Sequence, residues 1–259
     1  MRVSPLFTMA IAGLVALLIP SPQAAAQSAE HQGAAWNYEG KTGPLGWGKL
    51  DPEYKACSAG KQQSPIDIRG AKLNKSLAPI EFHYRATTLK LVNNGHTIQV
   101  EAKPGSYIVV DGVRYDLVQF HFHHPGEEAV KGRLSEMDAH LVHRSADGKL
   151  AVVAVRLKED INTANALMAE LWAHLPKTAG AEDKTAEMVN PAGLLPTNRG
   201  YWTYTGSLTT PPCTEGVKWL VMEEEVPVSR EQVRTFSLLF HINSRPLQET
   251  HGRKIEASE

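Results

Sequence analysis

The sequence predicts a mainly β protein: one sheet-dominated domain with a few short helices at its margins. Three observations carry this prediction. Short β-rich runs alternate with Asn-Gly, Pro-Gly and Asp-Gly turns, only two segments show a helical pattern, and no internal repeat or linker divides the chain. About 230 residues follow the N-terminal leader described next, which is enough for a single domain with a sizeable core.

Residues 1–26 have the pattern of a secretory signal peptide. Arg2 precedes an apolar run from Leu6 to Ile19, and the segment ends in Ala24-Ala25-Ala26, small residues typical of a cleavage site. The run is short for a membrane-spanning helix, although an uncleaved anchor is the alternative. We therefore expect a periplasmic or secreted protein with no membrane anchor after cleavage.

The charge of the chain argues against a nucleic-acid partner. Its formal net charge is −1, from 27 basic and 28 acidic side chains, and no basic run occurs. Hydrophobic residues make up 42% of the sequence, a content typical of a globular protein rather than a disordered one.

The first part of the mature chain, residues 34–68, is rich in glycine, proline and aromatic residues without a period, which predicts an irregular arm packed on the domain. Strands are expected after it, in runs bounded by turn residues. These runs are 79–84, 89–92, 97–101, 106–110, 114–123, 138–143, 150–157 and 217–226.

Two helices are expected. Leucines recur at four-residue spacing within residues 162–175, and Pro176 ends that pattern. Residues 229–240 begin with Ser229 and Gln232, the two polar positions of a capping box, and place apolar residues on one face.

The chain has two cysteines, Cys57 and Cys213. In an exported single domain, an even pair predicts one disulfide. Two free thiols or a metal site are the alternatives, and oxidising conditions disfavour free thiols. In the chain-entropy model, closing so long a loop stabilises the fold by at most about 5 kcal/mol.

Five of the eleven histidines lie between Gln119 and His143. Because alternate residues of a strand share a face, Gln119, His121 and His123 point one way, and the two phenylalanines between them point the other way.

The second histidine segment follows the same rule. Asp138, His140 and Val142 share a face. If the two segments are neighbouring antiparallel strands, His140 can meet the other two imidazoles, while His124 and His143 face away from that point.

Three imidazoles without a thiolate suit Zn²⁺, and three protein ligands leave the fourth position to water, as in catalytic zinc sites. Gln119 and Asp138 each lie one pleat from a candidate ligand, so each could accept an outer ring N–H. A His-x-His pair alone is more often solvated or part of a core. The third histidine on a plausible partner strand favours a catalytic zinc site.

With these residues placed, the chain resembles the α-class carbonic anhydrases of the bacterial exported type. The resemblance covers about residues 36–248 and is carried by the motifs WNYEG, QQSPIDI, NNGHT, QFHFH, EMDAHLVH, GYWTYTGSLTTPPCTEGVKW and NSRP. It implies a catalytic domain over residues 27–259 with a central twisted, mostly antiparallel sheet of about ten strands. It also implies reversible hydration of carbon dioxide to bicarbonate and a proton, by attack of a zinc-bound hydroxide.

The resemblance assigns roles to individual residues. One zinc per chain would be held by His121, His123 and His140. Thr209 would accept a hydrogen bond from the zinc hydroxide and donate its own hydrogen to Glu127.

Further residues are implied for the substrate, the water network and the proton. Thr210 would contact bicarbonate, and His96, which follows an Asn-Gly turn, would relay the proton to bulk water, since an imidazole titrates near neutral pH. The expected water chain comprises Tyr38, Asn94 and Gln99. The expected apolar wall for carbon dioxide comprises Val142, Val152, Leu208 and Trp219, for which plain core packing is the alternative.

Two supporting contacts are also implied. Asn243 would support His123 through its main chain. The disulfide would anchor the threonine loop to the N-terminal arm.

The sequence departs from the family pattern at several positions. Glu128 stands where many members have histidine, and Asp138 stands where glutamate is common, one methylene shorter, which could weaken or reroute its bond to His140. His124 and Ser244 replace bulkier residues. These changes bear on zinc affinity and rate, not on the reaction class.

Three other functions fit the sequence less well. A non-catalytic binding module on this fold would typically lack one of the zinc histidines. A dedicated zinc protease would show His-Glu-x-x-His on a helix, although weak esterase side activity is expected here. A zinc-storage protein would favour histidine-rich loops rather than strands. The resemblance implies inhibition by anions and sulfonamides, and a homodimer is left open.

Overall fold

The computed structural model describes Met1 and residues 33–259, and the folded domain lies within Gly33–Glu259. The predicted signal peptide, residues 1–26, falls outside the described residues except for Met1. None of the helices within the described part of the chain has the length and apolar character needed to cross a membrane.

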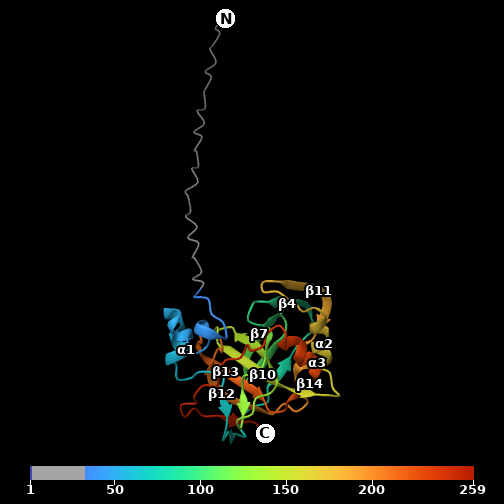
Figure 1. The fold of residues 1–259 in the computed structure, drawn as a ribbon. Coiled ribbons are helices and arrows are strands. Elements are labelled where there is room, and N and C mark those ends of the chain that lie inside the picture. The colour runs from blue at the N-terminus through green and yellow to red at the C-terminus, as the bar shows by residue number, and fades with distance from the viewer. Residues whose placement is uncertain (2–32) are drawn as a thin grey trace. The chain divides into compact units, whose positions relative to one another are not determined.

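One mixed sheet dominates the domain (Figure 1), and it joins 13 strands of the described chain. Its main path runs in the order β11 (Glu182–Val189), β4 (Thr87–Asn93), β5 (Ile98–Glu101), β7 (Val113–His123), β9 (Met137–Ser145), β10 (Leu150–Asp160), β13 (Glu215–Met222), β12 (Tyr201–Ser207), β15 (Glu256–Ala257) and β2 (Lys72–Leu73).

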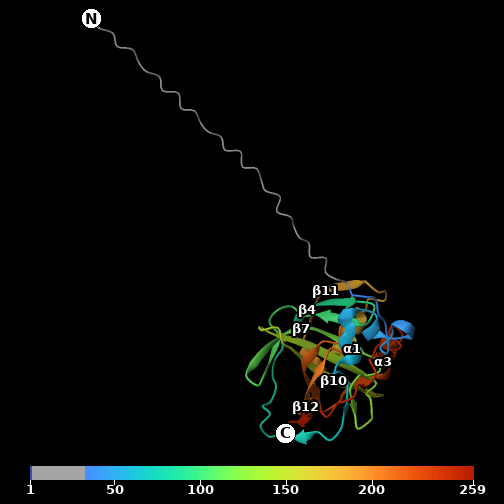
Figure 2. The ribbon, with the colours of Figure 1, turned by 90° about the vertical axis from the view of Figure 1, so that its left-hand side faces the viewer.

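Three further strands attach beside this path. β6 (Tyr107–Val110) pairs with both β7 and β3 (Glu81–His83), and β14 (Val226–Ser229) pairs with β10. A separate two-stranded sheet joins β1 (Asp67–Ile68) to β8 (Ala129–Val130). Figure 2 shows β11, β4 and β7 in this order across the sheet, where β5 lies between β4 and β7.

Most neighbouring strands run antiparallel. The parallel pairs are β10 with β13, β10 with β14, β15 with β2, and β1 with β8. The predicted mainly β fold with a mostly antiparallel central sheet is therefore confirmed.

Every predicted strand overlaps an observed one, but the predicted strand 217–226 is wrong as a continuous element. β13 ends at Met222 and β14 begins at Val226. Three consecutive glutamates separate them, and the last of these, Glu225, turns its carboxylate to Arg156 and Ser135. β11 and β12 were not predicted. β1, β2, β8 and β15 are only two residues long each, so they carry no period that a sequence pattern could reveal.

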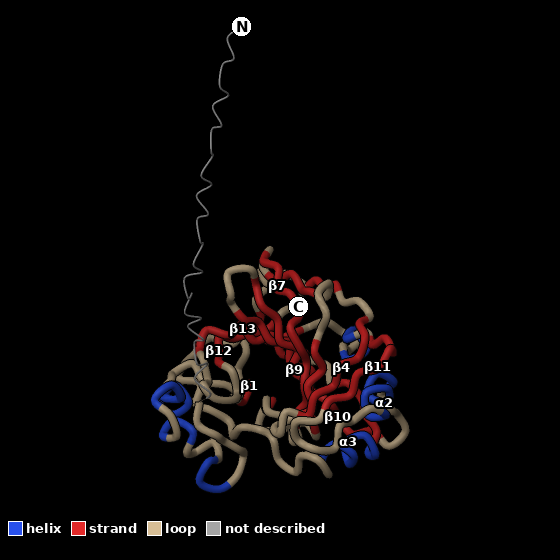
Figure 3. Tube along the Cα trace, turned by 90° about the horizontal axis from the view of Figure 1, so that it is seen from above, coloured by secondary structure: helices blue, strands red, loops and turns tan. Residues whose placement is uncertain are grey.

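The two predicted helices are present and shorter than their patterns. α3 (Arg230–Ser237) has both bonds of the predicted capping box between Ser229 and Gln232. α2 (Ala166–Ala173) begins where the Asn165 side chain accepts the N–H of Met168. Both helices lie at the margin of the sheet (Figure 3), as expected.

The N-terminal arm is more regular than predicted. It contains 3-10 turns at Gly40–Thr42, Trp47–Lys49 and Pro52–Lys55, and one turn of α-helix, α1 (Ala56–Ala59). A fourth 3-10 turn, Pro191–Leu194, precedes β12. In the arm, Trp47 is fully buried and clusters with the predicted disulfide between Cys57 and Cys213, whose Cα atoms are 5.1 Å apart.

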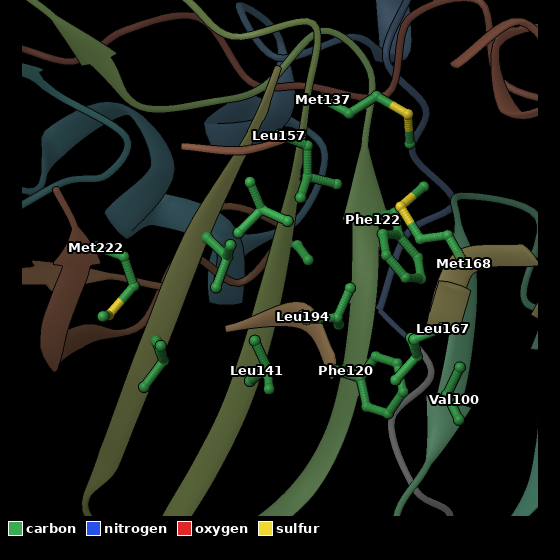
Figure 4. Packing of buried hydrophobic residues seen from close by; sticks show 14 of the residues in the cluster. Val100, Phe120, Phe122, Met137, Leu141, Leu157, Leu167, Met168, Leu194 and Met222 are labelled. Carbon is green, nitrogen blue, oxygen red and sulfur yellow. The ribbon is translucent and has the colours of Figure 1, made fainter. Parts of the chain in front are cut away.

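The main core lies on one face of β7, β9 and β10. Phe120 and Phe122 of β7 and Leu141 of β9 are fully buried there, as Figure 4 shows. Phe122 contacts Trp172 of α2, with ring centroids 5.0 Å apart, so the helices cover the apolar side of the sheet. The opposite face of the same strands carries polar side chains of β7 and, on β9 and β10, a second apolar cluster that includes Val142 and Val152.

Candidate metal centre

The histidine-bearing strands are neighbours. β7 and β9 pair antiparallel, with His121 opposite His140 and His123 opposite Asp138, which confirms the predicted pairing. Paired residues of a ladder project to the same face. The three imidazoles therefore meet on the side of the sheet that faces away from Phe120 and Phe122.

The three histidines bring one ring nitrogen each to within 4.8 Å of the others. His123 and His140 are 1% and 2% exposed, and His121 is partly buried. Burial and the two neighbouring imidazoles hold the pKa of His121 well below its usual value. A neutral imidazole is the form that binds a metal ion.

The outer nitrogen of each ring has a protein partner. His121 Nδ1 lies 2.8 Å from Gln119 Oε1, His123 Nδ1 lies 2.7 Å from the Asn243 carbonyl, and His140 Nε2 lies 3.2 Å from Glu128 Oε2. Since all three partners accept hydrogen bonds, these nitrogens carry the protons.

The inner nitrogens are therefore lone-pair donors: Nε2 of His121, Nε2 of His123 and Nδ1 of His140. Nε2 of His123 is buried and has no hydrogen-bond partner among the described residues. A buried polar atom without a partner is costly, and a metal ion would remove that cost. The donor set thus fits Zn²⁺ as the sequence analysis expected.

The hydrogen bond of His140 differs from the bond anticipated from the strand pattern. Asp138 Oδ2 lies 3.3 Å from His140 Nε2 as an ion pair, but the hydrogen bond is made with Glu128. The same Asp138 oxygen accepts the backbone N–H of Glu127 at 2.6 Å. The short Asp138 side chain thus shares its oxygen between Glu127 and His140, and Glu128 supplies a further acceptor for His140.

Three buried ionisable side chains lie together beside the metal centre: Glu128, Asp138 and His140. Burial raises the pKa of Glu128 to about 7. Burial also opposes the charge on Asp138, but the neighbouring His140 lowers the pKa of Asp138 overall. Burial would lower the pKa of His140, but Asp138 and Glu128 together raise it well above its usual value.

Glu127 is buried next to the three histidines. Its Oε1 accepts the backbone N–H of Arg245 at 2.7 Å, and its Oε2 has no hydrogen-bond partner within the described chain. The guanidinium of Arg245 donates to Gln63 and to the carbonyls of Ser64 and Cys57. These bonds tie Glu127 to the N-terminal arm.

Thr209 and Thr210 lie in the loop between β12 and β13. This loop is closed by hydrogen bonds from Leu208 N–H to the Thr214 carbonyl and from Cys213 N–H to the Thr210 carbonyl. Thr209 is buried. The hydrogen bond expected from Thr209 to Glu127 is not among those formed within the described residues.

His96 lies in the turn between β4 and β5. Its backbone N–H is accepted by Asn94 Oδ1 at 2.9 Å, and its carbonyl accepts from Asn243 Nδ2 at 3.0 Å. The His96 ring stacks on Trp36, with centroids 3.8 Å apart and planes at 9°. A pocket of about 300 Å³ lies against His96 and Tyr38.

The remaining residues predicted for the water network are Tyr38 and Gln99. Burial, helped by Glu127 and Asp138, raises the pKa of Tyr38 well above its usual value, so its hydroxyl stays protonated. Gln99 of β5 pairs directly with His121 and projects to the same face.

The four residues predicted to contact carbon dioxide belong to one apolar cluster. Val152 of β10 pairs with Val142 of β9 on one side and with Trp219 of β13 on the other. Leu208 packs against the same cluster. The Trp219 ring lies edge-on to His140, with centroids 5.0 Å apart. An apolar surface therefore adjoins the histidine group.

Two residues of this centre were missed by the sequence analysis. Glu128 was noted only as a departure, since it lies in a loop where no strand period assigns a face. Arg245 lies far along the chain in an irregular segment, so only the tertiary fold brings it to Glu127. The Glu127-Glu128 pair beside a histidine-rich strand was the one signal available for Glu128.

The fold and the three-imidazole group together define a mainly β protein in which three histidines on one face of the sheet could hold a metal ion. A family model described as eukaryotic-type carbonic anhydrase matches residues 42–259. The chain belongs to this family, the alpha carbonic anhydrases, whose enzymes are lyases that hydrate carbon dioxide.

Individual relatives agree with this membership. A carbonic anhydrase of Pectobacterium carotovorum is 41% identical over 221 residues, which span 85% of this chain and 89% of that protein. The alpha carbonic anhydrase of Thermovibrio ammonificans, solved with the inhibitor sulfanilamide, has a TM-score of 0.83 and 42% identity, covering 88% of this chain and 100% of its own. Dioscorin complexed with ascorbate has a TM-score of 0.81 and 32% identity, covering 86% and 97%.

Proposed function

We propose that this chain hydrates carbon dioxide reversibly with one zinc ion held by His121, His123 and His140. The observation that carries the proposal is that each histidine uses one ring nitrogen for a protein hydrogen bond and leaves the other available for a metal ion. All three outer nitrogens have acceptors, and the three histidines bring one ring nitrogen each to within 4.8 Å of the others. When bound, zinc would act as a Lewis acid that lowers the pKa of a water molecule toward neutrality, as is established for carbonic anhydrases themselves.

The polypeptide would hold and orient the reactants. Glu127 Oε2 is a buried acceptor with an open hydrogen-bonding position, which the Thr209 hydroxyl is proposed to fill. Once the Thr209 hydroxyl donates its single hydrogen to Glu127, its oxygen can only accept a hydrogen bond. The attacking water would therefore donate to Thr209, and this hydrogen bond would fix the direction of the water's lone pair. Thr210 is proposed to contact bicarbonate.

The apolar cluster beside His140 would receive carbon dioxide. Carbon dioxide has no hydrogen-bond donor, so a surface of Val142, Val152, Leu208 and Trp219 can accept it without leaving polar groups unpaired. The edge-on contact of Trp219 with His140 supports this position.

His96 is proposed to carry the proton between the centre and bulk water. Its ring is partly buried against Trp36, and this burial lowers its pKa. Tyr38, Asn94 and Gln99 would arrange water molecules between His96 and His121. Asn243 links the two ends, because its carbonyl accepts from His123 and its amide donates to the His96 carbonyl.

The proposed setting is outside the cytoplasm. Residues 1–26 would be removed as a signal peptide, and residues 27–259 would form the catalytic domain. The disulfide between Cys57 and Cys213 supports this setting, since such bonds persist in oxidising compartments. We also propose that sulfonamides bind this centre, supported by the similarity to the sulfanilamide-bound relative.

A ligand-binding module on the same fold is the second candidate function. The similarity to dioscorin complexed with ascorbate supports this candidate. The two candidates differ in what the metal centre is needed for. Three imidazoles would serve a zinc-binding module as well, whereas a buried carboxylate and an adjoining apolar surface beside them favour the enzyme.

The direct test replaces His121 with alanine and measures zinc content and carbon dioxide hydration on the same samples. The proposal predicts loss of bound zinc and of all zinc-dependent hydration. His124→Gln is the matched control, since His124 belongs to the same run but bonds the His241 carbonyl instead. Full zinc content and activity in His121→Ala would contradict the ligand assignment.

A further inference from the structure

We propose that Glu128 is the residue that holds His140 in its metal-binding orientation, and that Asp138 supports it by fixing the backbone that carries Glu128. Glu128 would be a positioning residue. The inference rests on the proposed function, in which His140 is a zinc ligand.

The contact geometry assigns the hydrogen bond of His140 to Glu128. His140 Nε2 lies 3.2 Å from Glu128 Oε2 with hydrogen-bond geometry, and Asp138 Oδ2, which also accepts the Glu127 N–H, lies 3.3 Å from the same nitrogen as a second charged neighbour. An Nε2–H fixed in this way leaves Nδ1 as the free donor nitrogen. Glu128 thus sets the tautomer as well as the ring orientation.

Asp138 acts on the other side of the same arrangement. Its Oδ2 accepts the backbone N–H of Glu127 at 2.6 Å, next to Glu128 in sequence. In β9 it lies two residues before His140, so a single short carboxylate bridges the ligand strand and the glutamate pair. Two carboxylates therefore adjoin His140 Nε2, and the oxygen of Asp138 is shared with the backbone N–H of Glu127.

The segment that carries Glu128 is held on both sides. Immediately after Glu128, β8 pairs with β1, and the Ala129 N–H donates to the Ile66 carbonyl at 3.2 Å. Before it, the Gly126 N–H donates to the Ser135 carbonyl at 3.0 Å. A Cβ on Gly126 would lie 3.0 Å from the Met137 carbonyl oxygen, so only glycine allows this close approach without a shift. Glu128 is consequently presented from a fixed backbone.

The arrangement is shielded from water. The side chains of His140, Glu128 and Asp138 are 2%, 0% and 1% exposed. Water therefore has no direct access to replace the glutamate as acceptor if its charge or reach is altered. The effect of such a change would fall on His140 and on the zinc that it holds.

The test measures the rate of zinc release to excess EDTA from the oxidised, zinc-loaded protein. Loss of a partner that orients a metal ligand typically weakens metal binding about 10- to 100-fold, so Glu128→Gln is expected to release zinc at least about tenfold faster than wild type. Asp138→Asn is expected to have a smaller effect. Glu225→Gln is the matched control, because Glu225 also accepts hydrogen bonds from two side chains, Ser135 and Arg156, but does not contact His140.

A rescue separates positioning from general structural damage. Adding Asp138→Glu to Glu128→Gln places a longer carboxylate beside His140, and slow zinc release is expected to return. If Glu128→Gln does not fold, Glu128→Asp takes its place, since it keeps the charge and withdraws the carboxylate by one methylene. Fast release from Glu128→Asp is then expected.

Two results would overturn the inference while leaving the proposed function intact: wild-type release rates in the Glu128 variants, or faster release from Asp138→Asn than from Glu128→Gln. A wild-type protein that binds no zinc would instead refute the proposed function itself.

Discussion

Strand β9 carries two buried histidines, three residues apart, in opposite environments. His140 projects to the polar face, where Glu128 and Asp138 raise its pKa well above the usual value. His143 projects to the other face, stacks on Tyr84 and contacts its hydroxyl through Nε2 at 2.8 Å, and burial lowers its pKa to about 3. The same side chain on the same strand thus lies among carboxylates and other imidazoles on one face and in an apolar core on the other.

Strand β7 repeats this division with different residue types. His121 and His123 line the polar face, while Phe120 and Phe122 are fully buried on the other. The two faces should therefore respond independently to substitution, one through metal content and the other through stability.

The largest expected contrast lies between neighbouring residues. Phe122→Ala should destabilise the domain by about 3–5 kcal/mol, the usual cost of emptying a buried phenylalanine site, while the folded protein keeps its zinc. His121→Ala should lose the zinc with a much smaller change in the stability of the metal-free protein. Chemical unfolding of the metal-free proteins and zinc content of the folded ones check this contrast. Loss of zinc from folded Phe122→Ala would break the division between the faces.

The second prediction concerns how protonation of His143 lowers the stability of the folded protein as the pH falls. Its folded pKa, about 3, lies below the value of about 6.5 in an unfolded chain, so the unfolded chain binds the proton first as the pH falls. The stability that neutral His143 provides is therefore complete above about pH 6.5 and is lost progressively toward pH 3, by about 2 kcal/mol between pH 6.5 and 5.

Metal-free wild type and His143→Phe, compared by urea unfolding at these two pH values, test this assignment. The variant should lose less stability than wild type over the interval, whatever its stability at neutral pH. Equal losses in the two proteins would mean that His143 does not titrate as its buried environment indicates.

The smallest expected effect belongs to a histidine that lies on neither face of β9. His96→Ala should lower turnover by less than about 100-fold, below the usual effect of removing a direct general acid or base, because buffer molecules can replace a relay near solvent. Stopped-flow hydration with and without added imidazole checks it. Zinc content should be unchanged, and absence of any buffer response would assign the relay to another group.

The parts of the site that could be predicted are those that strand period controls. Gln119, His121 and His123 alternate along one strand and therefore share a face, and His140 lies on a plausible partner strand. Side-chain alternation was thus enough to predict that the three histidines meet. Glu128 could not be placed in this way because it lies in a loop. Arg245 and the stacking of Trp36 on His96 also depend on irregular segments brought together only by the folded chain.

The same limit applies to the fold. The long strands β7, β9 and β10 and the capped helix α3 follow from local patterns, whereas two-residue strands such as β8 exist only because a neighbouring backbone pairs with them. The break between β13 and β14 reflects the bonding of Glu225 to Arg156, a contact between segments 69 residues apart.

The most direct test of the central claim is stopped-flow carbon dioxide hydration by the oxidised protein without its signal peptide, before zinc removal, after removal and after zinc return, with metal content measured on each sample. The account predicts fast hydration with one zinc per chain, loss of hydration with the metal, and recovery when zinc is restored. One bound zinc per chain without hydration would contradict the proposed enzyme, and the absence of bound zinc would contradict the assignment of His121, His123 and His140.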